Sequence, residues 1–317
     1  MPWFQGNFHC HTNNSDGKAT PVEVARYYKA IGMNFVAIAD HNRLTRAEEY
    51  QSVLARDFIG IPCSEYTGAA NCHVDGVDVS AAVGPQDAQL GLDPRAILQD
   101  GVDRIRAAGG VPVLCHPCWF WAYDGETVLQ LTGVTHFEVF NALPACNGYP
   151  VGGASFAEAI WDGVLSAGTR IFGVASDDAH WYGDAPGRSQ VPRHIPVGGT
   201  GWNVIKAARL ERKCIRDAFE SGHFYASTGI RLAEYVVTEG CISLKVAPWA
   251  QEKVHIEFVG EGGRSLGRTI GLEASYDIRG DEKYVRVRLA DTSGCFALTQ
   301  PVFPATIGPD TAWTREA

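Results

Sequence analysis

The first 230 residues alternate short apolar runs with segments of helical spacing, and this alternation restricts the possible folds more than any other feature of the chain. Residues 34–40 (NFVAIAD) are predicted to form a buried strand. The segment 21–32 before it begins with proline, has helical spacing and ends at glycine. Further strands are predicted at 57–65, 111–116, 135–141 and 170–176, and further helices at 93–110 and 155–168. Strands separated by helices imply parallel β–α units, arranged as an open sheet or a barrel.

The pattern changes after about residue 229. Residues 254–259 and 284–289 alternate apolar with polar side chains. In the second run, YVRVRL, the valines and the leucine lie on one face and the two arginines on the other. Such runs between glycine-rich turns predict a small antiparallel β module. We therefore expect two domains, one at 1–230 and a β-rich module at 231–317.

Charge and cysteine content limit the expected partners. The formal net charge of −9 argues against nucleic-acid binding, which requires clustered Lys and Arg. No apolar run approaches the roughly eighteen residues of a membrane span, and the first ten residues lack the features of a signal peptide. The nine scattered cysteines predict reduced thiols and a cytoplasmic location. A small-molecule substrate is the expected partner, and the oligomeric state stays open.

Histidines and carboxylates recur at the C-terminal ends of the predicted strands, where α/β folds place their sites. His9 and His11 are two residues apart, so on a strand both imidazoles share a face and can reach one ion. The other members of this pattern are His41, Glu65, His116, Asp178 and His180. One such residue alone would more often be an ordinary hydrogen-bonded side chain, but burying many together is costly without a metal. The combination predicts a metal centre.

Four further histidines do not share this pattern. We expect ordinary core or surface roles for His136, His194, His223 and His255.

The motifs resemble a known family. The segment HCHTNNSDGKATPVEVARYYKAIGMNFVAIADHN is similar to the opening of the polymerase-and-histidinol-phosphatase (PHP) domain, and LCHPCW and SDDAH match its later motifs. The resemblance covers roughly residues 3–230 and implies a distorted seven-stranded (β/α) barrel. The tail, from GWNVIKAARL to CFALTQPVF, resembles the PHP branch that includes carbaryl-hydrolase-like proteins, which carry a short β appendage after the barrel. The expected fold class is therefore α/β, a (β/α)7 PHP barrel followed by an antiparallel β module.

The resemblance implies three metal positions. The first would be held by His9, His11, Glu65 and Asp178. The second would share Glu65 and add His73 and His116. The third would use Asp16, His41 and His180. Because mixed nitrogen and oxygen ligands suit these metals, we expect two to three divalent ions of Zn, Mn or Fe.

His73 is the weakest match within this set. In NCHVDGVDV it is followed by Asp75 and Asp78, whereas family members usually place this histidine before an apolar strand. Asp75 is therefore an alternative ligand for the second position.

The implied chemistry follows from the ligands. A shared Glu65 would hold two ions about 3.5–4 Å apart, and water bound there would ionise near pH 7. The resulting metal-bridging hydroxide would attack phosphorus or a carbonyl carbon, and Asp178 or His180 would move the proton. Asp40 and Asp177 are expected to orient the metal ligands without binding a metal themselves.

Substrate contacts follow from position beside the motifs. They are predicted at Asn42, Arg43, Asn141 and Arg188. An arginine suits a bidentate phosphate contact, although each of these two arginines has the alternative of a solvated surface position.

The predicted activity is that of a metal-dependent hydrolase, a phosphoesterase acting on a small phosphate mono- or diester. The first alternative is a carboxyl-ester, carbamate or amide hydrolase with the same metal site, because the tail is similar to that branch. The second is a metal-binding module without catalysis.

Overall fold

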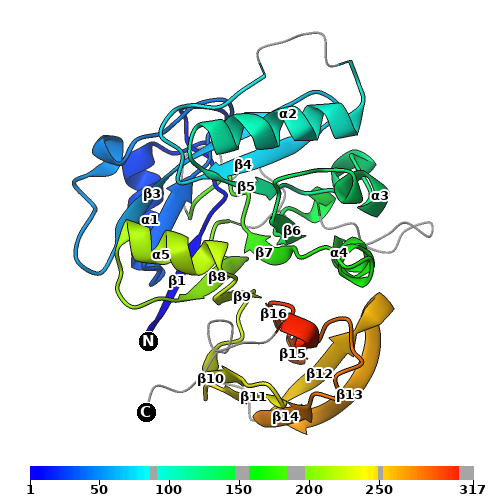
Figure 1. Ribbon diagram of the computed structural model, residues 1–317. Helices are drawn as coiled ribbons and strands as arrows, with labels where there is room; N and C mark the ends of the chain where they lie inside the picture. Colours follow the sequence, from blue (N-terminus) through cyan, green and yellow to red (C-terminus); the bar gives the residue numbers. More distant parts are fainter. Residues whose placement is uncertain (86–90, 147–156, 184–196, 249–252, 307–317) are drawn as a thin grey trace.

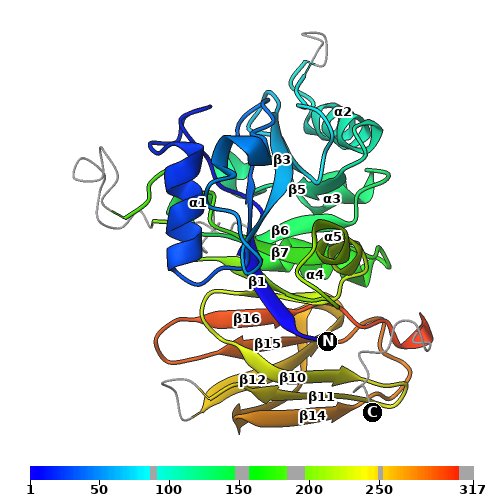
Figure 2. The same cartoon turned by 90° about the vertical axis from the view of Figure 1, so that its left-hand side faces the viewer.

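The structure is a computed structural model that describes residues 1–85, 91–146, 157–183, 197–248 and 253–306 (Figure 1). It is a mixed α/β fold with one large mixed sheet and one small sheet. The helices lie around the strands of the first part of the chain, and the C-terminal strands gather at one end of the molecule (Figures 1 and 2).

Seven strands build the first part of the large sheet, in the order β1-β2-β3-β4-β5-β6-β7. All neighbouring pairs are parallel except those of β4, which is antiparallel to both β3 and β5. The predicted strand at 34–40 corresponds to β2, whose FVAI run is buried throughout. The bounds are β1 (Trp3–Asn7), β2 (Phe35–Ile38), β3 (Ile59–Thr67), β4 (His73–Val77), β5 (Val111–Leu114), β6 (His136–Asn141) and β7 (Phe172–Ser176).

Capping residues define where the helices begin. Thr20 and Glu23 form a capping box at the start of the first helix, and Pro21 occupies its first turn. Asp93 caps the second helix in the same region as the predicted start. The helices are α1 (Pro21–Ala30), α2 (Pro94–Ala107), α3 (Gly125–Leu129), α4 (Ala157–Ser166) and α5 (Arg212–Glu220). The predicted helices at 21–32, 93–110 and 155–168 are thus confirmed as α1, α2 and α4.

The chain beyond β7 meets the chain beyond β1. Cys10 and Ala179 form a parallel bridge, in which the His11 backbone N–H donates to Ala179 O at 2.9 Å. The free edge of β7 is also covered by side-chain amides. Asn203 bonds both backbone groups of Ala175, and Gln300 bonds both backbone groups of Gly173. The bridge between Cys10 and Ala179 brings the carboxyl ends of the first and last of the seven strands together.

The C-terminal strands are antiparallel, as expected. One set forms a separate three-stranded sheet of β10 (Leu232–Val237), β11 (Cys241–Val246) and β14 (Glu273–Asp277). The other set continues the large sheet through β8 (Trp202–Lys206) and β9 (Phe224–Ser227) to β16 (Phe296–Thr299), β15 (Arg286–Ala290), β12 (Val254–Gly260) and β13 (Arg264–Gly271). Apolar side chains of both sets, such as Leu244 and Val287, share one core. The boundary near residue 230 stays a prediction, because hydrogen bonds between β9 and β16 cross it.

The predicted alternation in YVRVRL holds with one unexpected consequence. Val285, Val287 and Leu289 are buried on one face. On the other face Arg288 is 44% exposed, whereas Arg286 is only 1% exposed because α4 covers it.

All nine cysteines are free thiols in the structure. None of the helices in the described ranges combines the length and the apolar character that a membrane crossing requires.

Candidate metal centre

All nine predicted ligands lie together at the edge formed by the carboxyl ends of the parallel strands and the start of antiparallel β4. This follows from the topology, because the ends of parallel strands meet at one edge of a sheet. The residues follow β1, β2, β5 and β7, lie within β3, begin β4, or belong to the loop after β1: His9, His11, Asp16, His41, Glu65, His73, His116, Asp178 and His180. His116 and Asp178 have positive φ angles of 27° and 47°. Such strained backbone is typical of functional sites.

Three donor atoms lie close together at the first position, and the Glu65 carboxylate approaches two of them. His9 Nε2 and His11 Nε2 are 3.2 Å apart, and Asp178 Oδ1 lies 3.4 and 3.1 Å from them. Glu65 Oε1 lies 3.6 Å from His9 Nε2, and Glu65 Oε2 lies 3.8 Å from His11 Nε2. Ligand atoms about 2.0–2.2 Å from a tetrahedral ion are about 3.3–3.6 Å from one another. The donor atoms of His9, His11 and Asp178 are therefore spaced like ligands of one ion, and Glu65 lies slightly farther out.

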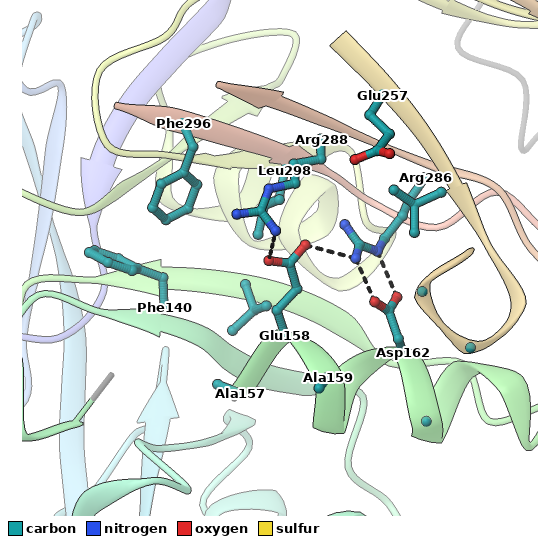
Figure 3. A pocket seen from close by; sticks show the side chains of 15 residues that line it. Phe140, Ala157, Glu158, Ala159, Asp162, Glu257, Arg286, Arg288, Phe296 and Leu298 are labelled. Atoms are coloured by element: carbon teal, nitrogen blue, oxygen red, sulfur yellow. Dashed lines mark hydrogen bonds and ion pairs between the residues drawn. The ribbon is translucent and has the colours of Figure 1, made fainter. Parts of the chain in front are cut away.

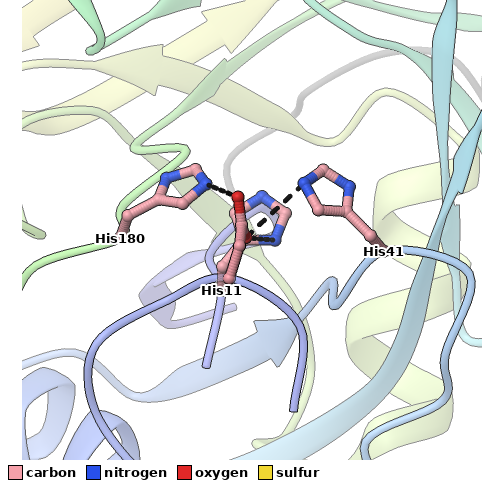
Figure 4. Close-up of side chains that lie close together, drawn as sticks. His11, His41 and His180 are labelled. Atoms are coloured by element: carbon pink, nitrogen blue, oxygen red, sulfur yellow. Dashed lines mark ion pairs between the residues drawn. The ribbon is translucent and has the colours of Figure 1, made fainter. Parts of the chain in front are cut away.

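The third position surrounds the Asp16 carboxylate. Asp16 Oδ1 lies 3.6 Å from His41 Nε2, and Asp16 Oδ2 lies 3.2 Å from His180 Nε2. His11 Nδ1 approaches the same carboxylate at 4.0 Å, so that three imidazoles converge on it (Figure 4). Asp16 is 52% exposed. This position therefore faces solvent, whereas the first is buried.

Glu65 connects the groups and reaches the second position. Its Oε1 lies 2.8 Å from His73 Nδ1 and 3.5 Å from His116 Nε2. His73, which the sequence left open, is buried and lies directly against this carboxylate. Asp75, the alternative, lies elsewhere: its Oδ2 is 3.2 Å from His9 Nδ1, the ring nitrogen opposite the first position.

The charges of the centre fit divalent ions. Burial lowers the pKa of His11 to about 4, which keeps its imidazole in the neutral form that binds metals. Burial alone would lower the pKa of His41, but the carboxylates of Glu65 and Asp16 raise it to about 10. These carboxylates thus attract positive charge, and either a proton or a divalent ion can supply it.

Within the described residues, several buried polar atoms of the centre also have no hydrogen-bond partner. They are His11 Nδ1, His116 Nδ1 and Asp75 Oδ1. Unpaired buried polar atoms are unfavourable. The donor set, its spacing and these atoms together fit metal binding.

Glu138 is a central residue that the sequence reasoning missed. Its Oε1 lies 2.7 Å from His9 Nδ1 and accepts from Ser176 Oγ. Its Oε2 accepts from the backbone N–H of the strained His116 at 2.8 Å, and from Asn141 Nδ2 at 3.1 Å. Glu138 therefore fixes the ring of one candidate ligand and the backbone of another. The signal was an acidic residue between the apolar Phe137 and Val139 in the strand HFEVFN.

The predicted substrate contacts separate in the structure. Asn141 is buried and donates to Asp178 Oδ2 at 3.1 Å, so it holds a candidate ligand. Asn42 lies beside the centre, and its Oδ1 accepts from Thr67 N at 2.9 Å. Arg43 is half exposed and pairs with Glu49 at 3.3 Å. Arg188 lies outside the described residues, as does His194.

Asp40 and Asp177, which were expected to orient the metal ligands, are both buried and hydrogen-bond to loop residues. Asp40 accepts from Thr12 N and Thr12 Oγ1, both at 2.7 Å, and from Ser15 Oγ at 2.8 Å, which orders the loop before Asp16. Asp177 accepts from Tyr28 OH, Asn7 Nδ2 and three backbone N–H groups at 199–201. Burial raises the pKa of Asp177 to about 6, against the effect of these donors. Neither contacts a candidate imidazole in the hydrogen bonds described.

The fold and site thus define a mixed α/β protein with a buried cluster of the kind that binds divalent ions. No family model and no curated protein matches the chain. Among solved structures, a two-domain protein from Bacteroides vulgatus, described as containing a predicted PHP-like metal-dependent phosphoesterase, aligns over 95% of this chain and 95% of its own. Its TM-score is 0.52 and its sequence identity is 14%. The chain therefore shares its fold with this PHP-like two-domain protein.

A second solved structure is an amidohydrolase from Chromobacterium violaceum with bound sulfate and no metal. It covers 61% of this chain and 93% of its own, at 16% identity and a TM-score of 0.40. A TM-score this low supports no conclusion about the present chain.

Proposed function

We propose that the chain is a metal-dependent hydrolase of the PHP type, acting as a phosphoesterase on a small phosphate mono- or diester. The observation that carries the proposal is the set of adjacent donor groups joined through Glu65 and His11. The fold shared with a PHP-like protein supports it. The contacts between the ends of β1 and β7 further support a distorted (β/α)7 barrel as its framework.

Two to three ions of Zn, Mn or Fe would occupy the centre. His9, His11, Glu65 and Asp178 would hold the first, Glu65, His73 and His116 the second, and Asp16, His41 and His180 the third. When bound, such ions lower the pKa of water and stabilise charge that develops on a phosphate or carbonyl oxygen.

The residues of the chain have separate tasks in this proposal. Asp178 has Oδ1 among the donor atoms while Asn141 holds its Oδ2. His180 Nδ1 lies 2.9 Å from the carbonyl oxygen of Asp178, which leaves its Nε2 directed at Asp16. We assign proton transfer to Asp178 and His180 because Asp178 belongs to the first donor group, His180 belongs to the third, and Asp178 Oδ1 lies 3.8 Å from His180 Nδ1.

Trp119 gives the site an apolar wall. Its ring centroid lies 5.2 Å from those of His73 and His116, in edge-on contact. An organic group attached to the bound phosphate would lie against this indole.

The activity can be tested on the metal-loaded protein with three nitrophenyl substrates: the phosphate monoester, the bis-phosphodiester and the acetate ester. We expect hydrolysis of a phosphate ester that stops on chelation and in the His9→Ala variant. Hydrolysis of the acetate alone would replace the proposal with the carboxyl-ester, carbamate or amide alternative. Protein without stoichiometric metal, and unchanged by His9→Ala, would indicate a module without catalysis.

Several further expectations stay predictions. These are the similarity to the carbaryl-hydrolase branch, the cytoplasmic location and the lack of nucleic-acid partners.

A further inference from the structure

A cavity lies outside the metal centre, between α4 and the C-terminal strands (Figure 3). Its volume is about 620 Å³, within the usual range of ligand pockets. Val139 and Phe140 of β6 line it, whereas Glu138 and Asn141 of the same strand contact the metal centre. The two sites therefore lie against different faces of one strand.

The charges along α4 in this cavity are already paired. Asp162 accepts from Arg286 Nε at 2.8 Å and from Arg286 Nη2 at 2.7 Å. Glu158 accepts from Arg286 Nη2 at 2.8 Å and from Arg288 Nη1 at 2.6 Å. Two arginines thus balance two carboxylates, and Figure 3 shows this network along one side of the cavity.

Glu257 is the third carboxylate that lines the cavity. It is half-buried and lines the cavity from β12, directly opposite Arg288 of β15 in the strand register. Side chains opposite one another in an antiparallel pair lie on the same face of the sheet. Among the residues that the structure describes, Glu257 has neither an ion pair nor a side-chain hydrogen bond.

Arg288 retains unused donors beside it. The residue is 44% exposed, and only its Nη1 is engaged, by Glu158, within the described part of the chain. A free acceptor and a free donor group therefore adjoin one another on this face of the sheet.

The rest of the wall is apolar. Phe140 and Phe296 meet edge to face with ring centroids 5.0 Å apart. Val259 and Leu298 are buried beside them. Leu298 is the register partner of Arg288 on its other side, so the apolar surface begins next to the charged pair.

We propose that this cavity binds a small α-amino acid with an apolar side chain. Its ammonium group would pair with Glu257, its carboxylate with Arg288, and its side chain with the apolar wall around Phe140 and Phe296. A zwitterion fits because it brings both charges without adding net charge. A phosphorylated ligand does not fit, since three carboxylates and only two arginines line the cavity.

The test is isothermal titration of the full-length protein with L-phenylalanine and three analogues that each lack one feature. Glycine lacks the apolar side chain, 3-phenylpropanoate lacks the ammonium group, and 2-phenylethylamine lacks the carboxylate. We expect L-phenylalanine to bind at least about tenfold more tightly than each analogue, because each lost contact removes about 1.4 kcal/mol or more.

Two variants assign the contacts. Glu257→Gln should weaken L-phenylalanine binding by about tenfold or more and leave the affinity for 3-phenylpropanoate unchanged. Arg288→Gln should weaken L-phenylalanine binding by a similar factor and leave the affinity for 2-phenylethylamine unchanged. Arg268→Gln is the matched control, because Arg268 also lies opposite Glu257 in the strand register but does not line the cavity.

Thermal unfolding without ligand should show that all three variants fold. The proposal is overturned if L-phenylalanine gives no binding heat up to about 10 mM. It is equally overturned if glycine binds as tightly, or if neither Glu257→Gln nor Arg288→Gln changes the affinity.

Discussion

The metal centre and the contact between α4 and β15 both bury several ionisable side chains, but they satisfy them differently. At the α4 contact, Arg286 is 1% exposed and its guanidinium bonds two carboxylates with ordinary hydrogen-bond geometry. Tyr284 OH also donates to one of these carboxylates, that of Asp162. Within the described residues, Arg286 Nη1 is the one buried side-chain donor of this contact without a hydrogen-bond partner.

In the metal centre the partners are imidazoles instead of arginines. Donor atoms lie close together there in groups of three and four, and within the described residues the Nδ1 atoms of His11 and His116 have no hydrogen-bond partner. An arginine supplies a fixed positive charge, whereas an imidazole supplies a lone pair that a metal can use. A buried cluster of carboxylates thus indicates packing when arginines complete it and metal binding when imidazoles do.

The largest expected difference between the two clusters is in activity. Asp178→Asn removes a candidate ligand and proton acceptor, so we expect kcat/KM to fall roughly 10²–10⁴-fold. The fold should persist, because asparagine tolerates the positive φ of 47° at this position. Steady-state kinetics on metal-loaded protein and circular dichroism would measure the two effects.

Asp162→Asn is the matched control from the α4 contact. It should lower thermal stability without changing kcat/KM. Equal loss of activity in both variants would contradict the division between the clusters.

The second prediction concerns stability, which should depend on the α4 contact more than on the metal centre. Arg286→Met leaves Asp162 without its main counter-charge, and breaking a buried pair in this way costs about 3–5 kcal/mol. Urea unfolding should show this loss, while the metal content stays unchanged. Arg288→Met is the control, because the 44% exposed Arg288 should contribute about 1 kcal/mol or less. Similar costs for both variants would argue against a buried network.

The third prediction concerns metal affinity. Glu138→Gln places an amide where Glu138 accepts from His9, Ser176, His116 and Asn141. We expect Zn or Mn affinity to fall about 10–100-fold, as for other residues that orient metal ligands. Competition with a chromophoric chelator measures this directly.

Glu158→Gln supplies the comparison for that variant. It removes a carboxylate of the α4 contact that, among the described residues, touches no candidate metal ligand. Metal affinity should therefore stay the same. If Glu138→Gln binds metal as well as the parent protein does, Glu138 has no orienting role.

The smallest effect is expected from a histidine that belongs to neither cluster. Burial lowers the pKa of His136 to about 4, although its Nε2 bonds Phe219 O at 3.0 Å. The unfolded chain, with a pKa near 6.5, then binds more protons, so stability falls as the pH drops from about 6.5 to about 4. The loss should be about 2 kcal/mol at pH 5.

Comparing urea unfolding at pH 7.5 and pH 5 in the parent and in His136→Asn isolates this contribution. The difference between the two pH values should shrink by about 2 kcal/mol in the variant. An unchanged difference would mean that His136 titrates normally in the folded protein.

Much of the centre could be predicted because its residues follow recognisable strands. His41 follows the apolar run FVAIA, and the HxH of His9 and His11 precedes a capped helix, so local pattern places them at strand ends. Glu138 could not be assigned in this way. Its partners lie in β7 or just after β1 and β5, and only the tertiary arrangement of these strands brings them to one carboxylate.

The sequence by itself determined which residue types would gather at the strand ends, and that Arg286 and Val287 would lie on opposite faces of a strand. Hydrophobic periodicity contains this information, since it sets the direction of each side chain. The tertiary structure alone decided what each face meets. It placed α4 over Arg286, completing a buried ion network, and it left a cavity beside Glu257. Such pairings depend on contacts between segments far apart in the chain, and periodicity does not encode which segments meet.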